Sequence, residues 1–221
     1  MITKLPRWVE YGAFILALVA GNVNAIGLIG FQHQSISHLS GSATLLGIGL
    51  VNASLEQVIH LLGVLLSFML GAALSGLMLS GHSLKLGRHY DSLLVIEAGL
   101  LALSIYLLSA DLSWGHFSAS AACGLQNALA TTYSGAIVRT THVTGIFTDL
   151  GLMFGAKLRG EPFDKRKAIL FLLIIIGFIL GGVLGAWLYA YWLFMALAVP
   201  ATICLLLALA YRLYSARIES V

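Results

Sequence analysis

The chain has 221 residues, of which 59% are hydrophobic and only 10% are charged. A soluble domain usually carries about 25% charged residues, and the mean hydropathy here is +0.96. This composition excludes soluble enzymes, secreted disulfide scaffolds and nucleic-acid-binding proteins. The net charge of +3 does not change that conclusion, because membrane proteins collect Lys and Arg in their cytoplasmic loops. We expect an all-α integral membrane protein in contact with the lipid bilayer.

The first apolar stretch follows Lys4 and Arg7 and imitates a signal peptide that ends at Ala25. We reject that interpretation because the same stretch takes part in an internal repeat, and we expect it to be retained as the first helix. In chain order, the apolar stretches are 8–30, 38–53, 55–80, 92–110, 114–133, 142–156, 168–189 and 191–212.

Two of these stretches, 38–53 and 142–156, are too short to cross a bilayer. Each forms roughly 22 Å of helix, whereas a hydrocarbon core is about 30 Å thick. The other six reach the length of about 20 residues that a spanning helix needs. We therefore predict six transmembrane helices and two re-entrant half-helices.

The basic residues agree with that count. They cluster at 4–7, 85–88, 157–167 and 212–217. If the two short stretches dip into the membrane and return, all four clusters and both termini become cytoplasmic, as the positive-inside rule requires. The alternative is eight spans, which places the loop around 85–88 on the outer side.

An internal repeat divides the single transmembrane domain of residues 1–221. Residues 21–25 and 124–128 both read G-x-x-N-A, and residues 38–47 resemble 142–151. Repeat one, at about 8–110, and repeat two, at about 114–212, each hold a span, a half-helix and two spans. Three crossings are an odd number, so the copies are inverted in the membrane, as in many transporters. Eight spans would instead make the repeats parallel.

The half-helices carry the predicted site. Residues 31–37 and 134–141, in extended form, would bring the chain to around the bilayer centre, where both half-helices begin. Helix N-termini offer unpaired N–H groups and partial positive charge to an anion or a polarised carbonyl. The predicted substrate-binding residues are Asn24, His38, Ser40, Gly41, Thr44, Asn127, His142, Thr144, Gly145 and Thr148.

Ionisable residues at membrane depth usually have a function. The candidates for proton coupling are His38, Glu97, His142 and Asp149. The structural alternatives are that Asn24 and Asn127 only brace the backbone and that Arg139 pairs with Asp149. Glu97 alternatively reaches the interface near Arg88 or His89.

No metal or cofactor is expected. His33, His38 and His142 have no accompanying carboxylate or thiolate, so we predict no metal site. Cys123 and Cys204 lie in apolar stretches and are read as buried hydrophobes. We expect no enzyme, because no nucleophile with an adjacent base and no cofactor motif occurs.

Two motifs carry a family resemblance: G-x-x-N-A-I-G with H-x-S-G-S-A-T-x-L-G, and G-L-Q-N-A with V-R-T-T-H-V-T-G-x-x-T-D-L-G. The chain resembles the YoaK-like bacterial membrane proteins, over nearly its whole length. The resemblance implies a multi-span membrane protein and supplies no substrate. Members of that family often have Asp where this chain has Asn24. The first copy of this chain therefore lacks an acidic residue at that position.

The sequence thus predicts a multi-pass transporter of the bacterial inner membrane for a small polar or anionic solute. The solute would bind near the bilayer midplane, with transport coupled to protons. The alternatives are a passive small-solute channel and a non-transport assembly or binding subunit. A homo-oligomer is compatible with either class.

Overall fold

The computed structural model describes residues 8–30, 37–79, 89–134 and 138–219, and all regular structure in them is helical. The expected all-α fold is confirmed. The elements are α1 (Trp8–Gly30), α2 (Leu39–Asn52), α3 (Leu55–Met78), α4 (Tyr90–Ser109), α5 (Trp114–Tyr133), α6 (Val143–Leu158), α7 (Lys165–Trp192), the 3-10 turn η2 (Leu193–Leu197) and α8 (Ala198–Glu219). Each expected apolar stretch corresponds to one α-helix.

Four continuous stretches among the described residues are long and apolar enough to cross a membrane. They are Val9–Gly30, Leu55–Met78, Tyr90–Ser109 and Lys165–Ala216. The last has 52 residues, about 78 Å if straight, which is too long for one crossing of a core about 30 Å thick. The chain turns inside it at Leu193, where φ is 49° and ψ is −133°, so that α7 and α8 are separate helices. The number of crossings stays a prediction.

Helix α5 is not among these four stretches, because its polar side chains lower its mean hydropathy. It lies among α1, α3 and α4, and its polar side chains donate hydrogen bonds to their backbone carbonyls. Ser120 Oγ donates to Val64 O at 2.8 Å, Ser118 Oγ to Leu100 O at 2.7 Å, and Gln126 Nε2 to Leu16 O at 2.7 Å. Such bonds join helices where no water competes for the donor.

Helices α1 and α7 cross at very short range. A Cβ atom at Gly21 of α1 would overlap the carbonyl oxygen of Phe178 in α7. One at Gly181 of α7 would overlap the carbonyl oxygen of Leu18 in α1. The small residues thus let the two backbones touch.

Helices α3 and α5 cross in the same way. A Cβ atom at Gly124 of α5 would overlap the carbonyl oxygen of Phe68 in α3. One at Gly71 of α3 would overlap the carbonyl oxygen of Ala121 in α5. These two crossings are the closest backbone contacts between helices that the glycines mark, and α4 and α8 pack beside them.

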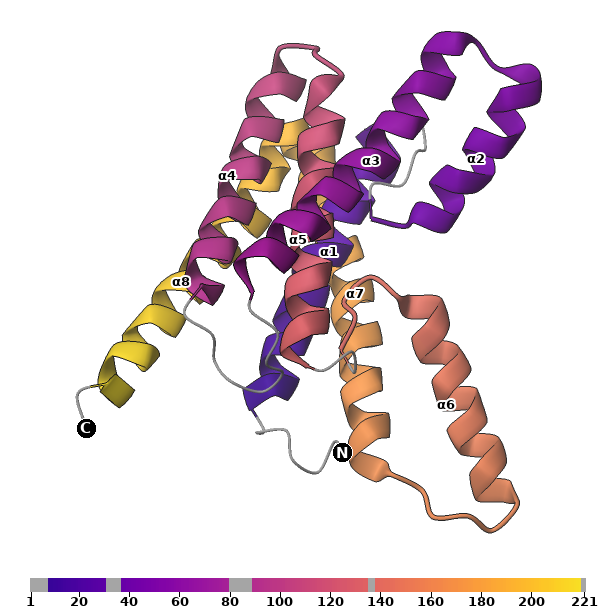
Figure 1. Cartoon of the computed structure of the whole chain (residues 1–221), viewed down its shortest axis with the longest axis vertical. Coiled ribbons are helices and arrows are strands. Elements are labelled where there is room, and N and C mark those ends of the chain that lie inside the picture. Colours follow the sequence, from indigo (N-terminus) through magenta and orange to yellow (C-terminus); the bar gives the residue numbers. More distant parts are fainter. Residues whose placement is uncertain (1–7, 31–36, 80–88, 135–137, 220–221) are drawn as a thin grey trace.

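The short helices α2 and α6 form two arms on one side of the bundle (Figure 1). α2 packs against α3 and α6 against α7. Both arms begin near mid-height and run to opposite ends of the molecule, α2 upwards and α6 downwards (Figure 1). Their lengths of 14 and 16 residues confirm that both are shorter than a spanning helix.

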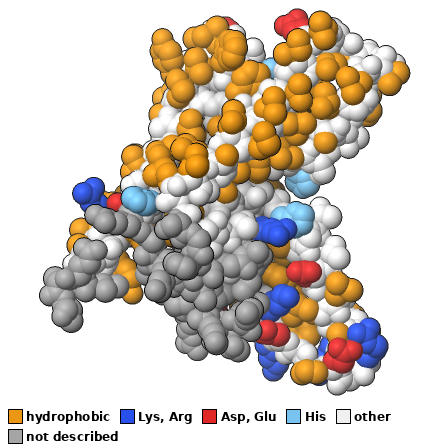
Figure 2. Space-filling model, in the orientation of Figure 1, with side chains coloured by type: hydrophobic (Ala, Val, Ile, Leu, Met, Phe, Trp, Pro, Cys, Tyr) orange, Lys and Arg blue, Asp and Glu red, His pale blue; other side chains and the backbone are white. Residues whose placement is uncertain are grey.

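The surface fits a membrane setting. Figure 2 shows hydrophobic side chains over the upper part of the visible face, while charged side chains gather at the lower end over α6 and α7. Large apolar side chains such as Leu77, Leu152 and Val183 are exposed. Trp114, Trp187 and Trp192 are also exposed, near helix ends, where aromatic side chains anchor a protein at the interface.

Candidate functional site

The first arm begins at His38. Its backbone precedes α2 as the N-cap residue, and its side chain makes no capping hydrogen bond. The ring instead lies with Nδ1 at 3.0 Å from Ser40 Oγ. Thr44 Oγ1 donates to the carbonyl oxygen of Ser40 at 2.8 Å, and Ser40 and Gly41 are exposed. His38, Ser40, Gly41 and Thr44 therefore lie along the start and the first two turns of α2.

The second arm begins at His142, which is the N-cap residue of α6 and again makes no side-chain cap. Its ring folds back over Gly145, where a Cβ atom would overlap it. Thr148 Oγ1 donates to the carbonyl oxygen of Thr144 at 3.0 Å, at the position that Thr44 has in α2. His142, Thr144 and Thr148 are exposed.

The two asparagines support the chain just before each arm. Ser37 Oγ donates to Asn24 Oδ1 at 2.8 Å, and Thr141 Oγ1 donates to Asn127 Oδ1 at 3.1 Å. Both amides thus hold the residue that precedes an N-cap histidine. This geometry supports the bracing role for Asn24 and Asn127, and it places both of them beside the arm starts.

Histidines, and not common N-cap residue types, stand at the cap positions of both arms. Ser40 and Thr144 are common N-cap residue types, but they lie inside the first turns, and the cap positions hold His38 and His142. A helix leaves its first four N–H groups without intrahelical partners. The side chains of the two cap histidines accept no hydrogen bond from these groups, and Gly41 N of the first arm donates to the His38 carbonyl oxygen at 3.1 Å.

Of the two arms, only the second has charged residues in it or just before it, among the described residues. Arg139 is exposed and Asp149 is half-buried. The alternative pairing of Arg139 with Asp149 does not occur. The ion pairs among the described residues are Arg159–Glu161 and Arg166–Glu10. Figure 2 shows histidine and basic side chains close together at the level where the arms begin.

Glu97 lies apart from the arms, inside the bundle. It is 1% exposed, so it does not reach the interface. The Cys204 thiol of α8 donates a hydrogen bond to its carboxyl group, and Cys123 of α5 is also near. Its Oε2 atom has no hydrogen-bond partner among the described residues. Both cysteines are free and buried, as expected.

One pair of residues was not anticipated. His116 Nδ1 of α5 lies 2.8 Å from His60 Nε2 of α3, and the two rings meet edge to face at 4.8 Å. The pair is separated by more than fifty residues in sequence and has no equivalent in the other crossing, so no local signal marks it. Within the described residues, no group of three or more His, Cys, Asp or Glu side chains could hold a metal ion. His33 lies outside those residues.

The comparisons give a family. No curated protein and no solved structure matches the chain. Residues 12–210 match the family described as "Protein of unknown function (DUF1275)". The resemblance to YoaK-like proteins is confirmed, because YoaK is a member of that family. With most of its length matched, the chain belongs to the DUF1275 family of membrane-type helical proteins.

Proposed function

We propose that this protein transports a small polar or anionic solute, bound where α2 and α6 begin. The observation that carries the proposal is the pair of uncapped helix starts near mid-height (Figure 1). Each presents backbone N–H groups and a histidine. Arg139 adds a full positive charge three residues before His142. Oriented N–H groups, imidazoles and a guanidinium together recognise a carboxylate or an inorganic oxyanion.

The inverted repeat is the second part of the proposal. Gly21 and Gly124 sit at the same place in the repeated G-x-x-N-A pattern, and they make the same close approach to α7 and α3. The Ser37–Asn24 and Thr141–Asn127 hydrogen bonds also occupy matched positions. These correspondences support two structurally equivalent halves. Inverted halves commonly alternate access to a central site.

Proton coupling would use ionisable residues at membrane depth. His38 and His142 stand at the arm starts, Asp149 lies within α6, and Glu97 lies in the core with one unpartnered oxygen. Such residues mark proton or solute paths in membrane proteins. We assign solute contact to the two histidines and to Arg139, and proton relay to Glu97 and Asp149. No enzymatic step is part of this proposal.

The membrane topology has a direct test. We expect six spans, two re-entrant arms and cytoplasmic termini in the bacterial inner membrane. Single cysteines replace the exposed residues His89, Glu161, Asn52 and Leu112, while the buried Cys123 and Cys204 are changed to Ala. His89→Cys and Glu161→Cys should react only from the cytoplasmic side, and the other two only from outside. Labelling of positions 89 and 161 from opposite sides would contradict the re-entrant arms.

Transport is tested in proteoliposomes. Nitrate, chloride, phosphate and sulfate gradients are applied, and an internal pH dye reports coupled protons. The double variant His38→Ala, His142→Ala should abolish the flux that the wild type shows, with an unchanged melting temperature. The matched control is His60→Ala, whose histidine lies at the α3–α5 crossing. The proposal would be contradicted if the double variant kept the wild-type flux and the wild-type rise in melting temperature on addition of the anion.

A passive channel is the second candidate, favoured by two short helices that start near the centre and run outwards (Figure 1). Glycerol and urea, followed by light scattering, distinguish it, because a channel passes neutral solutes without moving protons. A binding or assembly subunit would give no flux with any of these solutes.

A second copy of the chain would complete this site. His142 and Thr144 are exposed in a single chain, and lipid cannot satisfy polar groups at membrane depth. We propose that a homo-oligomer covers the arms. Mass measurement of single particles in lipid discs should give a protein mass of two or more times the 23.5 kDa of one chain.

A further inference from the structure

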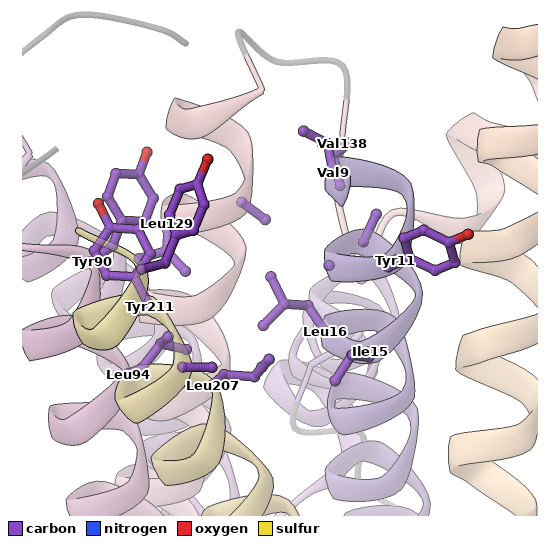
Figure 3. A pocket seen from close by; sticks show the side chains of 15 residues that line it. Val9, Tyr11, Ile15, Leu16, Tyr90, Leu94, Leu129, Val138, Leu207 and Tyr211 are labelled. Atoms are coloured by element: carbon purple, nitrogen blue, oxygen red, sulfur yellow. The ribbon is translucent and has the colours of Figure 1, made fainter. Parts of the chain in front are cut away.

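A cavity of about 430 Å³ opens between α1 and α8. Its walls come from the first half of α1, the start of α4, the end of α5 and the last turns of α8 (Figure 3). The volume lies within the range of about 300–1,000 Å³ that is typical of small-ligand sites. The lining is almost wholly aliphatic and aromatic, and no charged side chain of the described residues belongs to it.

The cavity occupies a place where the other half of the molecule is closed. Gly12 of α1 precedes Gly21 by the same interval as Gly115 of α5 precedes Gly124. A Cβ atom at Gly115 would overlap Leu108 of α4, and Ser104 Oγ donates to the Gly115 carbonyl oxygen at 2.8 Å. At Gly12 a Cβ atom would meet nothing within 4 Å, and this glycine lines the cavity.

The position of the cavity restricts its occupant. On α1 it runs from Val9 to Leu16, about 10 Å along the helix, which is a large part of one leaflet in a core about 30 Å thick. It lies at the end of the bundle where α1 begins and α8 ends, the end that the basic residues predict to be cytoplasmic. Water gains few hydrogen bonds where aliphatic side chains form most of the lining.

The tyrosines give the cavity a polarity. Tyr90 of α4 and Tyr211 of α8 stand together on one wall (Figure 3), with ring centroids 5.9 Å apart. Leu94 and Leu207 lie deeper, away from the Val9 end (Figure 3). Aromatic hydroxyl groups near a membrane surface with aliphatic groups beneath them match a lipid, whose polar ester region lies above its chain. Arg212, which follows Tyr211, is exposed.

From this geometry we propose that the cavity between α1 and α8 binds one unbranched acyl chain of a phospholipid from the cytoplasmic leaflet. The acyl chain fills a space that, between α4 and α5, is filled by direct contact of the two helices. It thereby keeps α1 and α8 apart. This site is separate from the arms, and the proposal does not rest on transport.

The test measures lipid that co-purifies with the whole protein. The wild type is extracted in digitonin, whose rigid steroid does not resemble an acyl chain, and phospholipid and free fatty acid per protein are measured by mass spectrometry. Gly12→Leu places four carbon atoms in the open space, which leaves no room for the acyl chain, so the co-purifying phospholipid should be lost. Ala210→Leu fills it from the α8 wall.

The matched control is Gly99→Leu. Gly99 also has nothing within 4 Å of a Cβ atom, it is exposed on α4, and it does not line the cavity. We expect stoichiometric phospholipid in the wild type and in Gly99→Leu, and its loss in both filling variants. Equal retention in all four proteins would overturn the proposal, as would retention of free fatty acid in place of phospholipid. Melting temperatures verify that each variant is folded.

Discussion

The two helix crossings, α1 with α7 and α3 with α5, have the same backbone arrangement but differ in the packing around it. Gly21 and Gly124 make the same approach to a carbonyl oxygen, and both are followed by an asparagine that accepts a hydrogen bond from the chain before an arm. The packing at Gly115 is closed, whereas the matched place at Gly12 opens into a cavity. Backbone contact therefore sets the framework, and the outer helices are free to differ.

The charges differ as well. Arg139 and Asp149 accompany the second arm, and Leu45 stands in the first arm where the second has Asp149. The His60–His116 pair belongs only to the α3–α5 crossing. Shared residues thus explain the framework and the paired histidines at the arm starts, whereas the unshared Arg139 and Asp149 are candidates for what sets the direction of transport.

The largest effect is expected at the crossings themselves. Gly21→Leu and Gly124→Leu each force a side chain into a backbone carbonyl of the facing helix. Both should lose more than about 4 kcal/mol of folding free energy, an exceptional value for one substitution. Size-exclusion chromatography of the detergent extract should show no monodisperse protein.

Gly76→Leu is the matched control, since a Cβ atom there meets nothing within 4 Å. It should give wild-type yield. If Gly21→Leu folded and Gly124→Leu did not, the two crossings would not be equivalent, and the inverted repeat would lose its support.

The asparagines should come next. In Asn24→Leu the hydroxyl of Ser37, which is 4% exposed, loses its acceptor, and in Asn127→Leu the same happens to Thr141. An unsatisfied buried donor costs about 1–3 kcal/mol, and thermal melting should register similar losses in both variants. Asn24→Asp and Asn127→Asp keep an acceptor oxygen and should melt within a few degrees of wild type. A loss in only one copy would show that the two hydrogen bonds have different roles.

Much of this framework could be predicted from the sequence. The length of the apolar stretches predicted every helix, because helix length depends on local pattern. The partners of Ser37 and Thr141 could not be predicted, since each bond joins a helix to a loop thirteen or fourteen residues away. Gly12 and Gly115 look alike in sequence, and only the three-dimensional arrangement of α4 and α8 makes one closed and the other open. The same holds for Glu97, whose burial depends on contacts with α5 and α8.

Arg139 tests whether the difference in charge between the two arms matters for function. Its side chain is exposed and has no ion pair among the described residues, so Arg139→Gln should leave the melting temperature unchanged. If it binds the anion, flux in proteoliposomes should fall about tenfold, which corresponds to about 1.4 kcal/mol. Arg159→Gln, in the loop before α7, is the control and should transport normally. Equal flux in both variants would place the anion elsewhere.

The smallest effect is expected for the ion pair between Arg166 Nε of α7 and Glu10 Oε1 of α1, which are 2.8 Å apart. It is the only ion pair across either crossing among the described residues, and its side chains are 29% and 20% exposed. A pair open to solvent contributes only about 0.2–1 kcal/mol. A double-mutant cycle of Glu10→Gln and Arg166→Gln isolates that energy from the other contacts of Arg166. The coupling should be greater at about 0.05 M than at about 0.5 M NaCl, because salt screens partly exposed charges. A coupling above about 2 kcal/mol that is insensitive to salt would mean that charge, as well as backbone contact, holds this crossing together, and the two halves would then differ in their framework too.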